Sequence, residues 1–134
     1  MPEFPHAVLA FAGYLAAAGG FTVLFVLIYT RLTPHREFDL IVHEHNVSAA
    51  VALCGSLVGF AIPLARAMSQ AVSIGEFAAW AVVALVVQVA AYWIARLAHH
   101  GLSEAIADNT VSAALWLASV SLTAGLLSAA AMTG

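Results

Sequence analysis

The sequence of 134 residues is 63% hydrophobic and only 8% charged, with a formal net charge of −3 at pH 7. Soluble domains are about 45–50% apolar and about 25% charged, so an ordinary soluble domain is excluded. A disordered tail is excluded as well, because disorder requires low hydrophobicity and high charge. The four basic residues against seven acidic ones do not form the basic surface of a nucleic-acid-binding protein. The remaining class is a membrane protein, with the lipid bilayer as its partner.

Four uncharged runs predict four transmembrane helices. They cover residues 4–30, 45–65, 77–95 and 109–134. A charged side chain at the centre of a membrane helix costs about 2.5–3.5 kcal/mol, so spans are expected where charges are absent. Even the run 77–95 would extend about 28 Å as an α-helix, close to the ~30 Å hydrocarbon core of a bilayer. The sequence therefore predicts an all-α, polytopic membrane protein with a single membrane domain over residues 1–134.

Polar residues mark the expected ends of these helices. The N-caps expected for the second, third and fourth spans are Asn46, Ser73 with its capping-box partner Glu76, and Asp108 with Asn109. Thr33-Pro34 also predicts the start of a short helix that runs to about residue 44. A second short helix is expected at 102–108. Each short helix would lie between two spans, at the membrane interface.

The arginines predict the orientation of the chain in the membrane. Arg31 and Arg36 flank the first loop and Arg96 flanks the third, whereas the opposite side carries Arg66. Short loops with more Arg and Lys stay in the cytoplasm. The first and third loops should therefore be cytoplasmic, and both termini should be periplasmic in a bacterial inner membrane.

An internal repeat is expected from the chain's similarity to itself. A shift of 64 residues places the tetrapeptide at 47–50 on the identical one at 111–114, with eight identities across the 24 positions from 45 to 68. A unit of two spans returns to its starting side, so its copy would have parallel topology. The predicted repeats are about 1–70 and about 71–134.

A small-residue motif in the second span predicts close helix packing. Gly55, Ser56 and Gly59 would let two helix backbones approach where lipid supplies no hydrophobic drive. Pro63 removes the hydrogen bond to the carbonyl of Gly59, which predicts a kink. The alternative role for these small residues is to line a pore. Similar ridges are expected at Ser121, Gly125 and Ala129 in the fourth span, and at Ala12, Ala16 and Gly20 in the first.

A polar stripe is expected on the third span. Gln88 lies near its middle, and Tyr92 and Arg96 follow at four-residue steps on the same face. A side-chain amide in hydrocarbon must find hydrogen-bond partners, so Gln88 should face protein or a wet cavity. Two interpretations stay open. Gln88 is either a hydrogen-bonded tie between helices or a point on a polar path for a solute or ion.

Metal-binding and catalytic motifs are absent from the sequence. Asp39 and His43, four residues apart, form the one pair that could share a metal ion on a helix, and no HExxH or paired CxxC motif accompanies them. The sequence also lacks a Gly-rich phosphate loop and a Ser nucleophile elbow. We therefore expect no metal, no cofactor and no catalytic residue.

A set of residues spread over the whole chain forms a recognisable family pattern: Thr33-Pro34-His35, Glu37, Asn46, Ser48-Ala49-Ala50, Gly55, Gly59, Pro63, Gln88, Asp108-Asn109-Thr110 and Ala131-Met132-Thr133. In these residues the chain resembles the YjfL-like inner-membrane family, called domain of unknown function 350. The run His43-Glu44-His45 departs from the Asn-rich stretch of that family. The resemblance implies a four-helix bacterial inner-membrane protein with a duplicated two-helix unit. It implies no established activity, and some relatives are similar in context to envelope-stress proteins.

Two functions follow as expectations. The first is a non-enzymatic, self-associating component of envelope maintenance, a homo-oligomer with envelope-stress proteins as partners. The alternative is an oligomeric channel or transporter for an ion or small solute. Against this alternative, the four uncharged runs carry no carboxylate, Lys or Arg, which proton-coupled transporters normally keep inside the membrane. A metalloenzyme built on the loop histidines ranks last.

Overall fold

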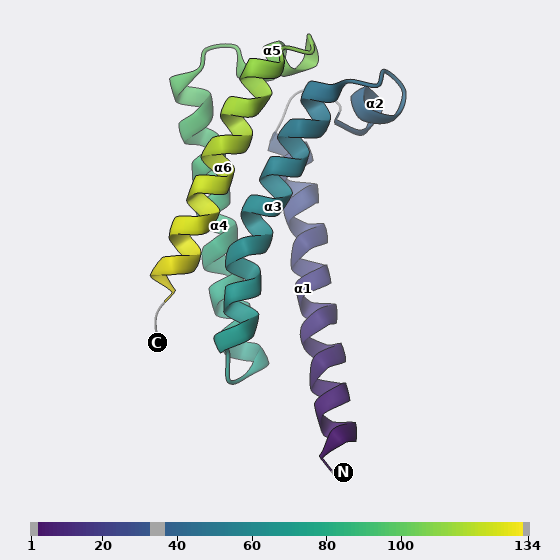
Figure 1. Ribbon diagram of the computed structural model, residues 1–134, viewed down its shortest axis with the longest axis vertical. Helices are drawn as coiled ribbons and strands as arrows, with labels where there is room; N and C mark the ends of the chain where they lie inside the picture. The colour runs from purple at the N-terminus through teal and green to yellow at the C-terminus, as the bar shows by residue number, and fades with distance from the viewer. Residues whose placement is uncertain (1–2, 33–36, 133–134) are drawn as a thin grey trace.

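The structure, a computed structural model, describes residues 3–32 and 37–132. The described residues form six helices, shown in Figure 1: α1 (Phe4–Leu32), α2 (Glu37–Val42), α3 (Val47–Gln70), α4 (Ile74–Ala98), α5 (Leu102–Ala107) and α6 (Val111–Ala131). Of these, α1, α3, α4 and α6 are long and apolar enough to cross a membrane. The predicted all-α fold is confirmed, and the four long helices are candidate membrane spans.

The four long helices alternate in direction. In Figure 1, α1 and α4 run upward, and α3 and α6 run downward beside each other. The short helices α2 and α5 both lie at the upper end, each just before a descending helix. The two ends of the described chain lie at the lower end, as an even number of spans requires.

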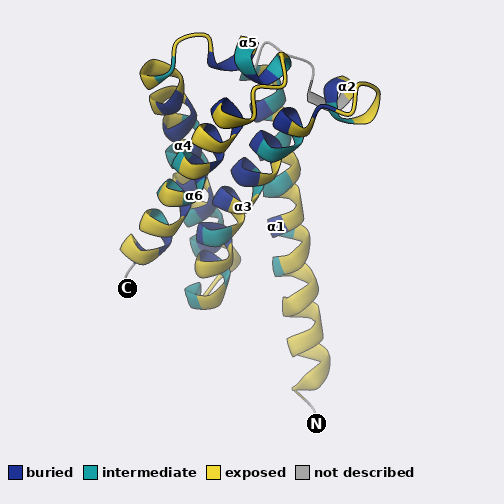
Figure 2. Ribbon diagram, turned by 45° about the horizontal axis from the view of Figure 1, so that its top comes forward, coloured by how far each residue is buried: buried dark blue, intermediate teal, exposed yellow. Residues whose placement is uncertain are grey.

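The core lies between α3, α4 and α6, and α1 is peripheral. Of the most apolar window of each helix, 56% is buried in α3 and only 11% in α1. The most extensive contact joins α3 to α6. Helix α1 packs on α3 and α4 through aromatic rings, among them Phe25, which stacks on Phe60 with ring centroids 4.9 Å apart. In Figure 2 the lower part of α1 is coloured as exposed.

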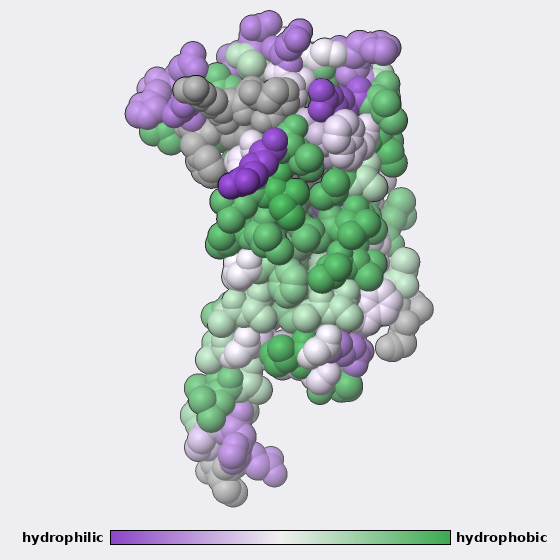
Figure 3. Space-filling model, turned by 180° about the vertical axis from the view of Figure 1, so that it is seen from behind, coloured by the Kyte–Doolittle hydropathy of each residue, from purple (hydrophilic) through white to green (hydrophobic). Residues whose placement is uncertain are grey.

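The lower end of α1 extends past the bundle. A β-carbon on Gly13 would lie 4.0 Å from Cδ1 of Ile74, the first residue of α4, so these two residues are level. Residues 4–12 therefore extend about 13 Å beyond the start of α4, at 1.5 Å per residue. Figure 3 shows a broad band of hydrophobic residues across the middle of the molecule, with hydrophilic residues at the upper end and at the tip of α1. Lipid would cover such a band in a membrane.

The two short helices end in related ways. His45 follows α2 with φ of 52°, and Asn109 follows α5 with φ of 63°, both in the left-handed region. The next long helices begin at Val47 and Val111, so both features recur 64 residues apart. The helix expected to run to about residue 44 ends at Val42, and its expected start at Thr33-Pro34 lies outside the described residues.

Candidate functional site

Helices α3 and α6 cross in close contact at three glycines. A β-carbon on Gly55 would lie 2.6 Å from Cα of Ala118, and one on Gly59 would lie 2.7 Å from the carbonyl carbon of Ser121. A β-carbon on Gly125 would lie 2.9 Å from the carbonyl carbon of Gly59. The obstructing atoms are mostly backbone, so no side chain could rotate to make room. Small residues are therefore required here, which is the packing role that these ridges suggest in the sequence.

Two serines belong to the same crossing. Ser56 and Ser121 are each 2% exposed, and their Oγ atoms lie 3.5 Å apart. Ala129 is also buried, one turn below Gly125. The predicted ridges of the second and fourth spans thus face each other inside one chain.

Pro63 leaves one carbonyl of α3 without its usual donor. The helix continues through Pro63, which is buried, but proline has no N–H to offer the carbonyl of Gly59. Gln88 of α4 fills this position, because its Nε2 donates to the Gly59 carbonyl at 2.9 Å and to the Ser121 carbonyl at 3.1 Å. Gln88 is 2% exposed. One amide group therefore joins α3, α4 and α6.

The other end of this amide is different. Gln88 Oε1 is buried and has no hydrogen-bond partner among the described residues. A buried acceptor without a donor costs about 1–3 kcal/mol. The amide is therefore held through its nitrogen alone.

Tyr92 and Arg96, which complete the predicted polar stripe, do not extend the hydrogen bonds of the Gln88 amide. Tyr92 is buried one turn above Gln88, with its hydroxyl 3.4 Å from Ser103 Oγ. Arg96 is exposed, and its guanidinium lies 5.2 Å from the ring centroid of Trp93. The structure thus places Gln88 and Tyr92 inside the bundle and Arg96 on its surface.

Asn46 joins the top of α3 to α5. Its Oδ1 accepts from the backbone N–H of Ala49 at 2.9 Å, which is the expected N-cap. Its Nδ2 donates to the carbonyls of Ile106 and Ala107 at 3.2 and 3.0 Å. The Asn46 side chain therefore bonds to backbone groups at the start of α3 and at the end of α5, where helical backbone partners are missing.

Asn109 has a role that the sequence prediction missed. It was expected with Asp108 to cap the fourth span, but the N-cap position of α6 is Thr110. Asn109 Oδ1 instead accepts from the backbone N–H and the Oγ of Ser48, at 3.0 and 2.9 Å. Its left-handed backbone turns the side chain toward the start of α3. Local sequence signals cannot find this contact, because it joins residues 61 positions apart.

The metal candidates Asp39 and His43 lie at the surface. Both residues are exposed, and the backbone N–H of His43 donates to the carbonyl of Asp39 at 2.9 Å. Over residues 3–32 and 37–132, no three His, Cys, Asp or Glu side chains are arranged to hold a metal ion. The described part of the chain therefore assembles no metal site around this pair.

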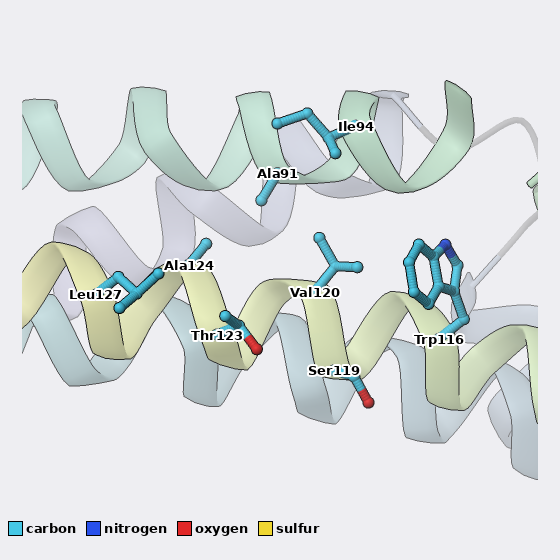
Figure 4. A pocket seen from close by; sticks show the side chains of 8 residues that line it. All are labelled: Ala91, Ile94, Trp116, Ser119, Val120, Thr123, Ala124 and Leu127. Carbon is cyan, nitrogen blue, oxygen red and sulfur yellow. The ribbon is translucent and has the colours of Figure 1, made fainter. Parts of the chain in front are cut away.

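A shallow groove of about 410 Å³ runs between α4 and α6 (Figure 4). Ala91 and Ile94 face it from α4, and Val120 and Ala124 face it from α6. Its lining consists of Ala91, Ile94, Trp116, Ser119, Val120, Thr123, Ala124 and Leu127. None of these lining residues is ionisable.

The fold and the crossing define an integral membrane protein of four spans, tied together by buried amides and close-packed glycines. The family profile described as Domain of Unknown Function (DUF350) matches residues 3–132, and the chain belongs to this family. The predicted family resemblance is confirmed.

Two relatives carry the name UPF0719 inner membrane protein YjfL, one from Escherichia coli (strain K12) and one from Escherichia coli O157:H7. Each is 37% identical to this chain over 125 residues, covering 93% of this chain and 94% of the relative. No solved structure matches.

Proposed function

We propose that this chain is a non-enzymatic, self-associating protein of the bacterial inner membrane that serves envelope maintenance. The observation that carries the proposal is the ridge of Ala12, Ala16 and Gly20 on α1, which is exposed. A β-carbon on Gly20 would have nothing within 4 Å among the described residues. The equivalent ridges of α3 and α6 are covered by each other.

An unpartnered ridge of this kind suits contact with a second copy. Glycine in a helix costs about 1 kcal/mol relative to alanine, and membrane helices place small residues where another helix approaches closely. A two-fold axis along the membrane normal would bring the ridges of two copies together at equal depth. Only Ala18, Phe25 and Tyr29 of α1 are buried within the chain, so most of its surface is free for such a contact.

The location is inferred from the relatives. Their name assigns them to the inner membrane, and the identity of 37% over 93% of this chain supports the same membrane here. With loops one and three in the cytoplasm, both termini would be periplasmic. The proposed role in envelope maintenance, with envelope-stress proteins as partners, rests on the similarity in context of some family members to envelope-stress proteins.

A channel or transporter has less support. Gln88, the candidate for a polar path, is 2% exposed and uses both amide hydrogens on backbone carbonyls. The surface groove between α4 and α6 has no ionisable lining, which also favours a non-enzymatic role.

A parallel duplication of a two-helix unit agrees with the same geometry. Helices α3 and α6 begin 64 residues apart, run in the same direction and are each preceded by a short helix and a left-handed residue. We infer that residues 1–70 and 71–134 are the two repeats. Helix α1 would break the symmetry of the two repeats, because it is peripheral whereas α4, its counterpart in the second repeat, lies at the core.

The proposed self-association is tested with matched alanine-to-leucine variants of α1. Ala16→Leu places three additional carbons on the ridge, and Ala10→Leu adds the same carbons at an exposed position about 120° around the helix. Light scattering in detergent and single-molecule photobleaching in native membranes report the subunit number. We expect Ala16→Leu to yield monomers and Ala10→Leu to keep the oligomer. A monomeric parent protein, or an oligomer that Ala16→Leu leaves intact, would refute the proposal.

A further inference from the structure

We infer that α3 contains a hinge at Pro63 that the side chain of Gln88 holds closed. The hinge divides α3 into an upper segment, residues 47–62, and a lower segment, residues 63–70. This inference does not depend on self-association. It rests on how unevenly the two segments are fixed to the other helices.

The upper segment is fixed by hydrogen bonds and backbone contact. Asn46, at its start, donates to two carbonyls at the end of α5. Ser48 bonds to Asn109 through both its backbone N–H and its hydroxyl. Gly55 and Gly59 bring its backbone against α6. The upper segment and α6 therefore behave as one unit.

The lower segment is held by apolar packing alone. Below Gly59, no hydrogen bond in the described part of the chain joins α3 to another helix. Leu64 and Ala67 are 5% and 0% exposed. Gln70 Nε2 is buried and has no hydrogen-bond partner among the described residues. Buried donors are nearly always paired in folded proteins, so this one does not help to hold the lower segment in place.

Between the two segments, one side chain replaces a missing backbone bond. Pro63 has no N–H, so the helical bond across the junction to the Gly59 carbonyl is lost. Gln88 donates one hydrogen to that carbonyl and the other to the Ser121 carbonyl. The pair of bonds fastens the junction to α4 and α6 together. Gln88 Oε1 makes no bond within the described chain, so the amide is held by its two nitrogen bonds. Rotation of the amide breaks both bonds and frees the hinge.

Pairs of nitroxide labels test whether Gln88 holds the hinge. In a Cys54→Ala background, Ser69→Cys with Ala130→Cys places labels at exposed sites on the lower segment and on lower α6. Val47→Cys with Ser112→Cys gives the control pair at the exposed upper ends of α3 and α6. Pulsed electron paramagnetic resonance in lipid nanodiscs measures the distance distribution of each pair, with and without Gln88→Leu.

We expect Gln88→Leu to broaden or shift the distribution of the lower pair and to leave the upper pair unchanged. Adding Pro63→Ala to Gln88→Leu should narrow the distance distribution of the lower pair again, because the introduced alanine would supply the N–H that the Gly59 carbonyl lacks. The inference would be overturned if Gln88→Leu left the distance distribution of the lower pair unchanged, or changed that of the upper pair equally.

The design also covers a variant that does not fold. Gln88→Asn shortens the side chain by one methylene, so its amide falls short of the two carbonyls. This variant should therefore broaden the distance distribution of the lower pair as Gln88→Leu does. If Gln88→Leu does not accumulate, the hinge predicts that Gln88→Leu with Pro63→Ala does accumulate. Failure of this double variant as well would contradict the hinge, because the restored backbone bond should replace the amide.

Discussion

The amide of Gln88 donates a 2.9 Å hydrogen bond to the carbonyl of Gly59, which is the carbonyl that Pro63 leaves without a helical donor. A polar side chain at mid-membrane and a proline in a neighbouring helix are each unfavourable alone. Together they satisfy each other, because the amide needs an acceptor and the carbonyl needs a donor. The same carbonyl group lies against Gly125, so the polar tie and the glycine crossing occupy one place in the bundle.

The glycine crossing predicts that small additions are destabilising there. Gly59→Ala and Gly125→Ala each place a methyl group against backbone atoms of the opposite helix, so the helices must separate. Overpacking of this kind costs about 1–3 kcal/mol in the free energy of unfolding. Unfolding by sodium dodecyl sulfate in mixed micelles measures the change.

Gly75→Ala is the matched control for these variants. A β-carbon on Gly75 would lie 3.9 Å from Ser73 Oγ, an ordinary contact, and alanine favours the helix. We expect no loss of stability from Gly75→Ala. Equal stability of all three variants would mean that the crossing does not require glycine.

The Asn46 joint predicts a large effect from a single amide. Asn46→Ala removes the cap on α3 and leaves the carbonyls of Ile106 and Ala107 without this donor. The expected loss is about 1–3 kcal/mol of stability. Ser73→Ala, which removes the one cap bond of Ser73 to Glu76 at an exposed helix start, should cost less. A larger loss from Ser73→Ala would count against the joint.

His45 predicts a stabilising substitution. Its φ of 52° lies in the left-handed region, which costs a non-glycine residue about 1–2 kcal/mol. His45→Gly should therefore raise the melting temperature, since the side chain is exposed and glycine adopts this φ freely. His43→Gly is the control, because His43 does not have a positive φ, and it should be neutral or destabilising. A lower melting temperature for His45→Gly would contradict this account of the loop.

The arginine distribution predicts the topology. A reporter fused after Gly134 should be periplasmic, because Arg31, Arg36 and Arg96 hold the first and third loops inside. Alkaline phosphatase and green fluorescent protein fusions at this position distinguish the two sides. Fluorescence without phosphatase activity would reverse the orientation, although the alternation of the helices would stand.

The sequence predicts the spans well because each depends on a local property. Charges are excluded from hydrocarbon, so the uncharged runs locate α1, α3, α4 and α6. Most of the helix ends lie within a few residues of the ends of these runs. The small ridges and the donor missing at Gly59 could likewise be read from spacing. These signals depend on the local sequence and need no knowledge of tertiary contacts.

The tertiary pairings could not be read in this way. The sequence indicates that Gln88 needs a partner, but not that Gly59 supplies it from 29 positions away. Asn109 looks like a cap for its own helix and instead contacts Ser48. The exposure of the α1 ridge was equally hidden, because ridges on three spans look alike in sequence while α3 and α6 cover only each other.

A double-mutant cycle of Gln88→Leu and Pro63→Ala tests most directly the claim that the amide replaces the bond that proline removes. Unfolding free energies of the four proteins in lipid or mixed micelles give the interaction energy. We predict that Gln88→Leu costs about 0.6–2 kcal/mol beside Pro63 and distinctly less in the Pro63→Ala background, where the alanine N–H would satisfy the Gly59 carbonyl. An equal cost in both backgrounds would show that Gln88 and Pro63 act independently and would contradict the claim.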